Sequence, residues 1–336
     1  MLAIREKYQL EKKPELDLPP RIFNHSAAEF SDDFNRLPFQ LSHNLADHPL
    51  FDLARIEQLA ERIWSEGGGD VTFHVAEKPI DGKWEDVRRQ RRSLLDAIAN
   101  IQTSDSWILI KGIQKVPEYD AILRKGIDEL DEIVGDHLKE KIAWLDAYLF
   151  IASPHAVTPY HIDGESTFLM QVHGEKDYNI IDPNDRSIIT DVEIENYYVG
   201  DLSAARFKDE CPDKAFVIHM KPGVGLHQPA RSPHWVTNGD EFSVTLSFLF
   251  LTHEYTMHAR VFQANHYLRK LGFSPVGPGR SAVRDSVKKV MFGNLWHKPR
   301  NKYELLRYGH DKYKAPMNLL RKIARRPAPA GSTNRV

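Results

Sequence analysis

The spacing of apolar residues divides the chain into stretches of different periodicity. In the first part, apolar side chains recur every three or four residues in three segments, which predicts amphipathic helices. These helices are expected over residues 50–64, 84–101 and 117–133, with short β-branched strands at 71–76 and 107–111. Pro117 favours the first turn of the last helix. Residues 1–47 show little periodicity, and we expect an irregular arm there.

Beyond residue 141 the pattern changes to short apolar segments separated by Gly, Pro, Asn and Asp. The expected strands are 143–152, 158–163, 168–173, 176–182, 215–220 and 242–251. Many short strands at such spacing predict a sandwich or a barrel. From Tyr255 the spacing becomes helical again, and the only acids are Asp285, Glu304 and Asp311 among many Lys and Arg. This basic region is expected to be a solvated or dimerising helical face, or else a surface for an acidic partner.

Composition narrows the class of protein. The 336 residues carry 45 Lys and Arg against 47 Asp and Glu, a formal charge of −2 that gives no overall attraction to nucleic acid or membranes. Cys211 is the single cysteine, so no disulfide can form within the chain and a reducing compartment is expected. The first residues are too charged for a secretory signal, and no apolar run is long enough for a bilayer. We expect a cytoplasmic protein.

Two candidate metal ligands lie on one predicted strand. His161 and Asp163 are two residues apart in the segment TPYHID, so both side chains would leave the same face of a strand. Non-haem iron(II) sites use two imidazoles and one carboxylate on one side of the metal, with open positions opposite. A His-x-Asp pair is common by chance, and a second histidine further along the chain is therefore required.

Three histidines, His219, His227 and His234, are candidates for that second ligand. His219 lies in an apolar run, which favours a role in the core or in a strand pair, and His227 is the main rival of His234. The segment 222–238 resembles the second cupin motif, with Gly223, Pro229, His234 and Asn238 in register. Arg231 stands where that motif often has Gly, which questions the tightness of the turn and leaves the ligand unaffected.

The text HIDGESTFLMQVHGEKDYNIIDPND further resembles the Jumonji C iron(II) and 2-oxoglutarate-dependent oxygenases, in particular the asparaginyl hydroxylase group. Those enzymes follow their His-x-Asp pair with an apolar strand, a Gly turn and a Lys that binds the distal carboxylate of 2-oxoglutarate. Lys176, fifteen residues after His161, matches that Lys, and Thr158 matches a family Thr that touches the same carboxylate. Thr167 and Ser247 fall near two positions at which the asparaginyl hydroxylases carry polar residues beside the metal and the cosubstrate. This sequence lacks the Asn of that family at both positions.

The resemblance, which covers about residues 141–252, implies a mainly β fold with α additions. A double-stranded β-helix of the cupin or jelly-roll type at 141–252 would follow a helical and mixed region at 1–140 that packs on the barrel. A basic helical region at 253–336 would complete the chain, and its helices make a homodimer plausible. His161, Asp163 and His234 would bind iron(II), and Lys176 with Thr158 would hold 2-oxoglutarate. The implied activity is hydroxylation of a protein or small molecule with dioxygen, with demethylation as a variant.

Two alternatives remain at this point. A metal-binding cupin can act as a ligand sensor or regulator without turnover. A cupin enzyme that does not use 2-oxoglutarate holds its metal with more histidines and a Glu, for which Glu165 would be the candidate.

Overall fold

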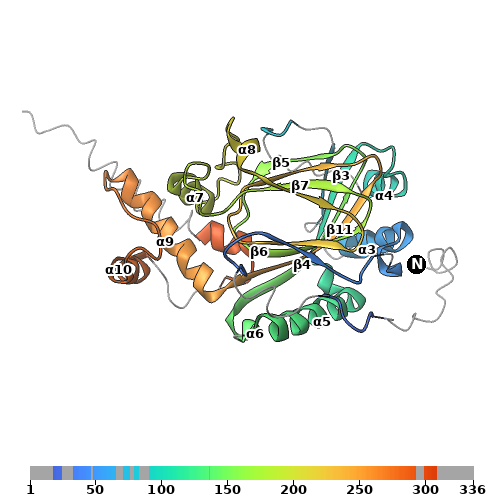
Figure 1. Ribbon diagram of the computed structural model, residues 1–336, viewed down its shortest axis with the longest axis horizontal. Coiled ribbons are helices and arrows are strands. Elements are labelled where there is room, and N and C mark those ends of the chain that lie inside the picture. Colours follow the sequence, from blue (N-terminus) through green and yellow to red (C-terminus); the bar gives the residue numbers. More distant parts are fainter. Residues whose placement is uncertain are drawn as a thin grey trace, which may run out of the picture.

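The computed structural model places two antiparallel β-sheets face to face, with helices on the outside (Figure 1). It describes residues 18–24, 33–46, 48–65, 71–75, 79–82, 91–135, 137–292 and 299–308. The strands are β1 (Phe39–Ser42), β2 (Val71–Val75), β3 (Ser106–Lys111), β4 (Ile142–Ala152), β5 (Val157–His161), β6 (Ser166–His173), β7 (Lys176–Ile180), β8 (Phe216–Met220), β9 (Val224–Gln228), β10 (His234–Asn238) and β11 (Ser243–Thr252). The larger sheet has the order β1-β9-β6-β11-β4-β3-β2, and the smaller has the order β5-β10-β7-β8. This is a jelly-roll core of the expected class.

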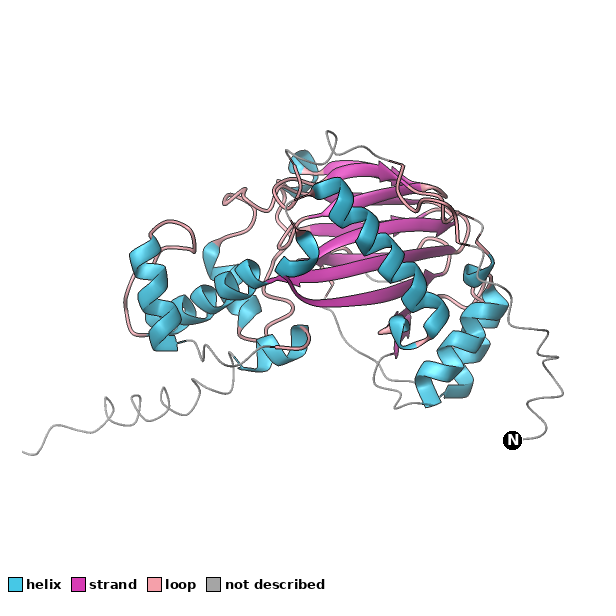
Figure 2. Cartoon of the chain, turned by 90° about the horizontal axis from the view of Figure 1, so that it is seen from below, coloured by secondary structure: helices cyan, strands magenta, loops and turns pink. Residues whose placement is uncertain are grey.

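Helices lie outside the two sheets and at their ends. They are α3 (Leu53–Ser65), α4 (Arg91–Ala99), α5 (Pro117–Val134), α6 (Leu138–Lys141), α7 (Asp191–Tyr198), α8 (Cys211–Lys214), α9 (His253–Lys270) and α10 (Ala282–Phe292), with 3-10 turns η1 (Pro49–Phe51) and η2 (Ile113–Lys115). Residues 302–308 form one further helical segment. Figure 2 shows a long helix, α5, lying across the outer face of the larger sheet.

The main hydrophobic core lies between α5 and that outer face. Strand residues alternate, so that Phe168, Leu246 and Phe248 are buried on the helix side of the sheet. Gly126 of α5 lies so close to the Phe248 ring that a Cβ there would overlap it. The opposite face of the sheet is thereby left to line the space between the two sheets, where the polar residues of the site gather.

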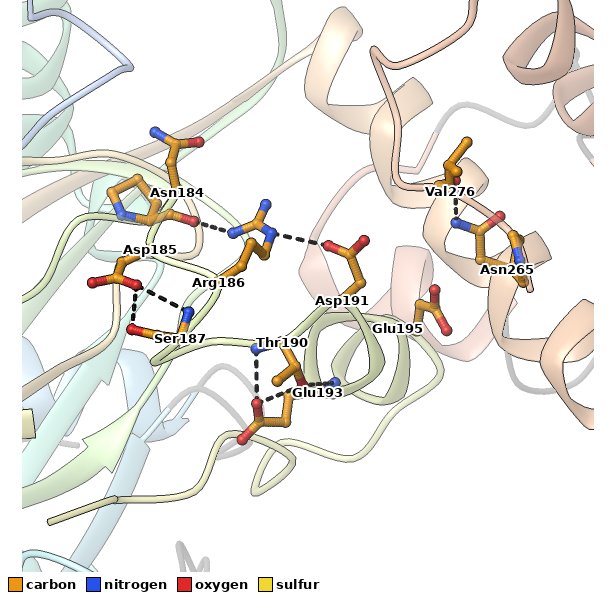
Figure 3. Close-up of polar contacts among 12 residues, drawn as sticks. Asn184, Asp185, Arg186, Ser187, Thr190, Asp191, Glu193, Glu195, Asn265 and Val276 are labelled. Atoms are coloured by element: carbon orange, nitrogen blue, oxygen red, sulfur yellow. Dashed lines mark hydrogen bonds and ion pairs between the residues drawn. The ribbon is translucent and has the colours of Figure 1, made fainter. Parts of the chain in front are cut away.

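The start of α7 is fixed by hydrogen bonds that the sequence makes locally. Thr190 Oγ1 accepts a bond from the Glu193 amide at 3.2 Å, and Glu193 Oε2 accepts one from the Thr190 amide at 2.8 Å (Figure 3). This is a capping box, which satisfies amide groups that a helix leaves unpaired at its start. Arg186 Nε also donates to Asp191 Oδ1 at 3.0 Å in the same view.

The far end of α7 packs on the turn that carries Asp163. Tyr197 and Tyr198 are fully buried there. The Tyr197 hydroxyl accepts a hydrogen bond from the Gly164 amide at 2.9 Å. A Cβ at Gly164 would lie 3.1 Å from the Tyr197 ring, so the residue after Asp163 is small because an aromatic side chain closes over it. Helix α7 therefore helps to hold the turn of the candidate site.

Most of the expected elements are confirmed within one or two residues, and the exceptions are informative. Strand β1 lies inside the arm that we expected to be irregular, and it pairs with β9, so its four residues gain order from the sheet. Strand β5 ends at His161, which leaves Asp163 outside it and corrects the expected strand 158–163. The expected helix 84–101 is described only as α4, since residues 83–90 lie outside the described part.

The division into three regions stays a proposal. Strand β3 pairs with β4 in register, and β1 pairs with β9, so the larger sheet includes strands from both sides of residue 140. Of the basic region 253–336, α9, α10 and the segment 302–308 are described, and residues 309–336 lie outside the described part. Among the described helices, none combines the length and apolar character that crossing a bilayer requires.

Candidate active site

Strand pairing brings the two candidate histidine ligands together. His161, the last residue of β5, lies directly opposite His234, the first residue of β10, in an antiparallel pair. Their ring centroids are 4.1 Å apart. The register shifts between His234 and Val236, where β5 has one residue more than β10. Two residues that are far apart in the sequence thus become neighbours because the sheet places them so.

Asp163 completes the cluster from the turn after β5. Its Oδ2 lies 3.7 Å from His161 Nε2 and 3.9 Å from His234 Nε2. One ligand atom from each residue lies within 4.8 Å of the others, and the described residues hold no other such group of three. Asp163 turns inward although it is outside the strand. Its backbone carbonyl accepts a bond from the Arg231 amide at 2.6 Å, which ties this turn to the loop before His234.

Both imidazoles are oriented by backbone carbonyls. His161 Nδ1 contacts Pro159 O at 2.7 Å, and His234 Nδ1 contacts Ser232 O at 3.0 Å. Because a carbonyl only accepts, each Nδ1 carries the proton, and the unprotonated Nε2 of each ring faces Asp163. Burial lowers the pKa of His161, and burial together with the His161 ring lowers the pKa of His234 to about 3. The rings are therefore neutral, which is the form that binds metals.

The outer oxygen of Asp163 is held by a lysine from the C-terminal region. Lys302 Nζ donates to Asp163 Oδ1 at 2.6 Å and lies 3.5 Å from Glu165 Oε2. Burial works against a charge on Lys302, but the carboxylates of Asp163 and Glu165 outweigh it and hold the pKa of Lys302 well above its ordinary value. Burial likewise raises the pKa of Asp163, but Lys302 and the two imidazoles outweigh it and hold that pKa well below its ordinary value.

Lys302 was not among the residues that the sequence predicted. It lies 139 positions from Asp163 in a basic region that reads as a solvated face, and its type and spacing match no motif. A faint signal existed in the apolar pair Leu305 and Leu306, since buried leucines on a short basic helix indicate that it packs against the barrel.

Lys176 lies at the start of β7 in the same cavity as the three candidate ligands. Its side chain is buried, and its Nζ donates to Thr245 Oγ1 at 2.5 Å. Thr245 in turn donates to Gln171 Oε1 at 2.7 Å. Burial lowers the pKa of Lys176 to about 7, and no carboxylate among the described residues pairs with its ammonium. A buried cation without an anion is costly, so this end of the cavity suits an acidic ligand.

Thr158 lines the same cavity from β5. Its Oγ1 accepts a hydrogen bond from Trp107 Nε1 at 3.0 Å, which fixes the hydroxyl in place. The hydroxyls of Thr167 and Ser247 also line the cavity, and neither has a hydrogen-bond partner in the described structure. Buried hydroxyls usually find partners, so these two favour a polar occupant. Tyr148 and Phe150 form an aromatic part of the wall, while Phe168 lies in the core on the other side of the sheet.

The rival ligands lie elsewhere. His227 is fully buried among Phe34, Phe39 and Phe168, and its Nε2 accepts a bond from the Asn35 amide at 3.0 Å. Burial lowers its pKa to about 3, as expected for a neutral core histidine. His219, which we expected in the core or in a strand pair, lies on β8 with its side chain 60% exposed. The strand-pair alternative is confirmed, because His219 lies opposite Asp177 in the β7–β8 pair, and the core position is not, because that face of β8 is open to solvent.

Two further expectations concern neighbouring residues. Glu165, the candidate ligand of a different cupin chemistry, faces Lys302 and is not in the ligand cluster. Arg231, which replaces a frequent Gly of the cupin motif, adopts a φ of 70°. That left-handed conformation is the one that glycine favours, so the turn has the expected shape in spite of the arginine. The Arg231 guanidinium lies 5.1 Å from the centroid of the Tyr255 ring, a contact that helps to hold the strained residue.

The donor set is compatible with iron(II). Two neutral imidazole nitrogens and one carboxylate oxygen form the arrangement typical of non-haem iron(II) sites, which have open positions for other ligands. Lys176, which has no carboxylate partner among the described residues, lies in the same cavity as the hydroxyls of Thr167 and Ser247, which find no hydrogen-bond partner there. The residues present therefore fit an iron ion together with a small dicarboxylate.

No protein-family model and no curated protein matches this sequence. Solved structures that resemble it include YcfD, a ribosomal oxygenase from Escherichia coli, in complex with cobalt and 2-oxoglutarate, with TM-score 0.47, 15% identity, and coverage of 90% of this chain and 66% of that one. The same protein with cobalt and succinic acid gives TM-score 0.46, 15% identity, and coverage of 81% and 66%. The chain thus spans just under two thirds of the length of these neighbours.

Proposed function

We propose that this protein is an iron(II)- and 2-oxoglutarate-dependent oxygenase. The observation that carries the proposal is the cluster of His161, Asp163 and His234 in one cavity with a buried lysine, Lys176, that lacks an anionic partner. If the cluster and Lys176 only stabilised the fold, the buried ammonium of Lys176 would have no compensating negative charge, because no carboxylate of the described residues pairs with it. An acidic cosubstrate removes that cost.

In this proposal each residue of the cluster has one role toward the metal. His161 Nε2, His234 Nε2 and Asp163 Oδ2 hold iron(II), and the carbonyls of Pro159 and Ser232 keep the two imidazoles in the tautomer in which Nε2 is unprotonated. When bound, iron and 2-oxoglutarate together supply dioxygen activation, with succinate and carbon dioxide as products and oxygen transfer to a C–H bond of the substrate.

Lys176 and Thr158 hold the cosubstrate in this proposal. The Lys176 ammonium binds the carboxylate far from the metal by a charge-assisted hydrogen bond. Thr245 and Gln171 keep Nζ in place from the side, through bonds of 2.5 and 2.7 Å. Thr158, oriented by Trp107, donates to the same carboxylate with its own hydroxyl. The chain thereby contributes binding, orientation and exclusion of water.

The substrate is proposed only as a class. Tyr148, Phe150 and Tyr303 form an aromatic part of the cavity wall, and Lys111 donates a hydrogen bond to the Tyr303 hydroxyl. Hydroxylation of a protein side chain or of a small molecule is compatible with this wall. The motif around His161 resembles the asparaginyl hydroxylases. The similarity to the YcfD structures does not support that group over other oxygenases. Hydroxylation of a protein therefore rests on the sequence resemblance.

Succinate formation tests the proposal. The purified protein is incubated with iron(II), 2-oxoglutarate, ascorbate and air, and succinate is measured over time. Slow succinate formation without added substrate is expected, and it should be absent from His234→Ala and normal in His219→Gln, whose imidazole lies outside the cluster. Metal binding without succinate, in the presence of protein and metabolite extracts, would favour a sensor or regulator of the cupin type.

Dimerisation through the C-terminal helices stays a prediction. On α10, Val283, Val287 and Val290 recur at helical spacing, and their exposed fractions are 75%, 50% and 69%. Asp285 and Lys288 of the same helix are buried instead, so the apolar side of α10 faces outward. A second copy of the chain that packs there would cover the three valines. Light scattering measures the mass of the wild type and of Val287→Glu in solution, and a dimer held by these valines should be present only in the wild type.

A further inference from the structure

The carboxylate of Asp163 divides its two oxygens between different partners. Oδ2 faces the Nε2 atoms of His161 and His234, at 3.7 and 3.9 Å. Oδ1 accepts a hydrogen bond of 2.6 Å from Lys302 Nζ. The side chains of Asp163 and Lys302 are 22% and 17% exposed, so water competes little for either oxygen. One oxygen is thus directed toward the candidate metal position and the other is held away from it.

We propose that Lys302 is a positioning residue that keeps Asp163 a one-oxygen metal ligand. A free carboxylate can bind a metal through both oxygens, which takes up a coordination position that the cosubstrate and dioxygen need. A short, charge-assisted bond to Oδ1 opposes that rotation. The inference rests on the proposed function, because it assumes that His161, Asp163 and His234 bind a metal.

The helical segment 302–308 holds Lys302 in place. Asn301 Oδ1 accepts a bond from the Glu304 amide at 2.9 Å, which caps the start of the segment. Leu305 and Leu306 are buried against the end of the barrel. Gln263 Nε2 of α9 donates to Leu305 O at 2.9 Å and to Tyr198 O at the same distance. Lys302 is therefore the first residue of a short helix that is fixed on two sides.

A lysine beside a divalent cation would be repelled unless negative charge were close to it. Asp163 supplies most of that charge, and Glu165, fully buried with its Oε2 3.5 Å from Lys302 Nζ, adds to it in its ionised form, although burial raises the pKa of Glu165 to about 7. The Lys302 ammonium also lies 5.7 Å from the centroid of the Tyr197 ring. Lys302 is thus bound between two carboxylates and an aromatic face. This explains why Glu165 is buried next to the cluster and is not part of it.

This arrangement makes the metal site depend on a segment outside the barrel. The strands of the barrel contribute His161 and His234, and the turn after β5 contributes Asp163. The group that orients Asp163 comes from beyond α10, 139 residues further along the chain. The candidate site is therefore complete only when the C-terminal region is folded onto the barrel.

Titration of the full-length, metal-free protein with cobalt(II) tests the inference without any turnover. We expect Lys302→Met to bind cobalt(II) about 10- to 100-fold more weakly than the wild type, the usual cost of losing a group that orients a ligand. Its visible cobalt(II) bands should also weaken, because a second carboxylate oxygen raises the coordination number. Lys221→Met, which removes an exposed lysine away from the cluster, should match the wild type in both.

A conservative variant separates orientation from folding. Lys302→Arg keeps the cation and the donor and should recover most of the affinity that Lys302→Met loses. If Lys302→Met fails to fold, as judged by thermal unfolding of the metal-free chain, the comparison of Lys302→Arg with the wild type decides. Affinity within twofold of the wild type in Lys302→Met, or an equal loss in Lys302→Arg and Lys302→Met, would overturn the inference. If the wild type itself binds no cobalt(II), the proposed function fails first.

Discussion

His161 and His234 lie directly opposite each other across the antiparallel pair of β5 and β10, with ring centroids 4.1 Å apart. Since side chains alternate along a strand, a slip of one residue in this register would turn one of the two imidazoles to the other face. The register shifts directly after this pair, because β5 has one extra residue between the partners of His234 and Val236. Two of the three candidate ligands are thus set by one strand register.

Replacement of His234 should abolish tight metal binding, while replacement of the other two candidate histidines should not. His234→Ala removes one of the three donor atoms that lie within 4.8 Å of one another. His219→Gln alters an exposed residue, and His227→Gln alters a core residue on the other side of the larger sheet. Manganese(II) titration by calorimetry compares them. Loss of metal by His227→Gln with retention by His234→Ala would reverse the assignment.

Lys176→Met should lose affinity for 2-oxoglutarate and keep affinity for the metal. The substitution removes the buried ammonium and leaves the imidazoles and Asp163 unchanged, and a lost charge-assisted bond of about 1.5–3 kcal/mol corresponds to about 10- to 150-fold in affinity. Titration of the manganese(II)-loaded protein with 2-oxoglutarate, without oxygen, measures it. The matched control is Lys208→Met, a lysine outside the cavity, and equal binding by both variants would exclude the assigned role.

Binding of 2-oxoglutarate should weaken as the pH rises through 7. Burial lowers the pKa of Lys176 to about 7, below its ordinary value, so the free protein loses the ammonium above that pH and the ligand must restore it. For a single group with this pKa, affinity at pH 8 should be about tenfold below that at pH 6. The decrease should be absent from Lys176→Arg, because arginine stays charged. A flat profile in the wild type would show that Lys176 does not bind the carboxylate as an ammonium.

Gly126→Ala should destabilise the fold although it lies in a helix. Alanine normally gains about 1 kcal/mol over glycine inside a helix. At this position the added Cβ would overlap the buried Phe248 ring, and such overpacking costs about 1–3 kcal/mol. We expect a net loss of about 1 kcal/mol in the free energy of unfolding, measured with urea. The double variant Gly126→Ala with Phe248→Leu should recover part of it, and a more stable single variant would show that the helix and sheet can separate at no cost.

Helices and strands can be predicted from the sequence where their own residues show the apolar spacing of that element. Helix α5 and strands β3, β4 and β11 follow from apolar spacing within one segment. Strand β1 does not, because its residues gain order only by pairing with β9. The approach of Asp163 to His161 was expected from strand alternation, but Asp163 lies in the turn after β5, and a bond from the Arg231 amide to its carbonyl helps to hold that turn.

Groups that act on the site from distant segments could not be predicted. Lys302 reaches Asp163 only because the helical segment 302–308 folds back on the barrel. In the sequence, no neighbouring motif distinguishes Lys302 from the other lysines of this basic region. The same is true of Thr245, which orients Lys176 from the opposite sheet. A motif identifies site residues that lie at a fixed spacing in one segment. Lys302 and Thr245 join the site through tertiary contacts, which no local spacing records.

The most direct test of the account is the visible absorption of the protein with iron(II) and 2-oxoglutarate in the absence of oxygen. A keto acid that chelates an iron(II) ion held by two imidazoles and a carboxylate produces a weak charge-transfer band. We expect this band in the wild type, with one iron per chain, and its absence in His161→Ala and His234→Ala. A wild-type protein that binds iron and 2-oxoglutarate without the band, or a band that persists in His234→Ala, would contradict it.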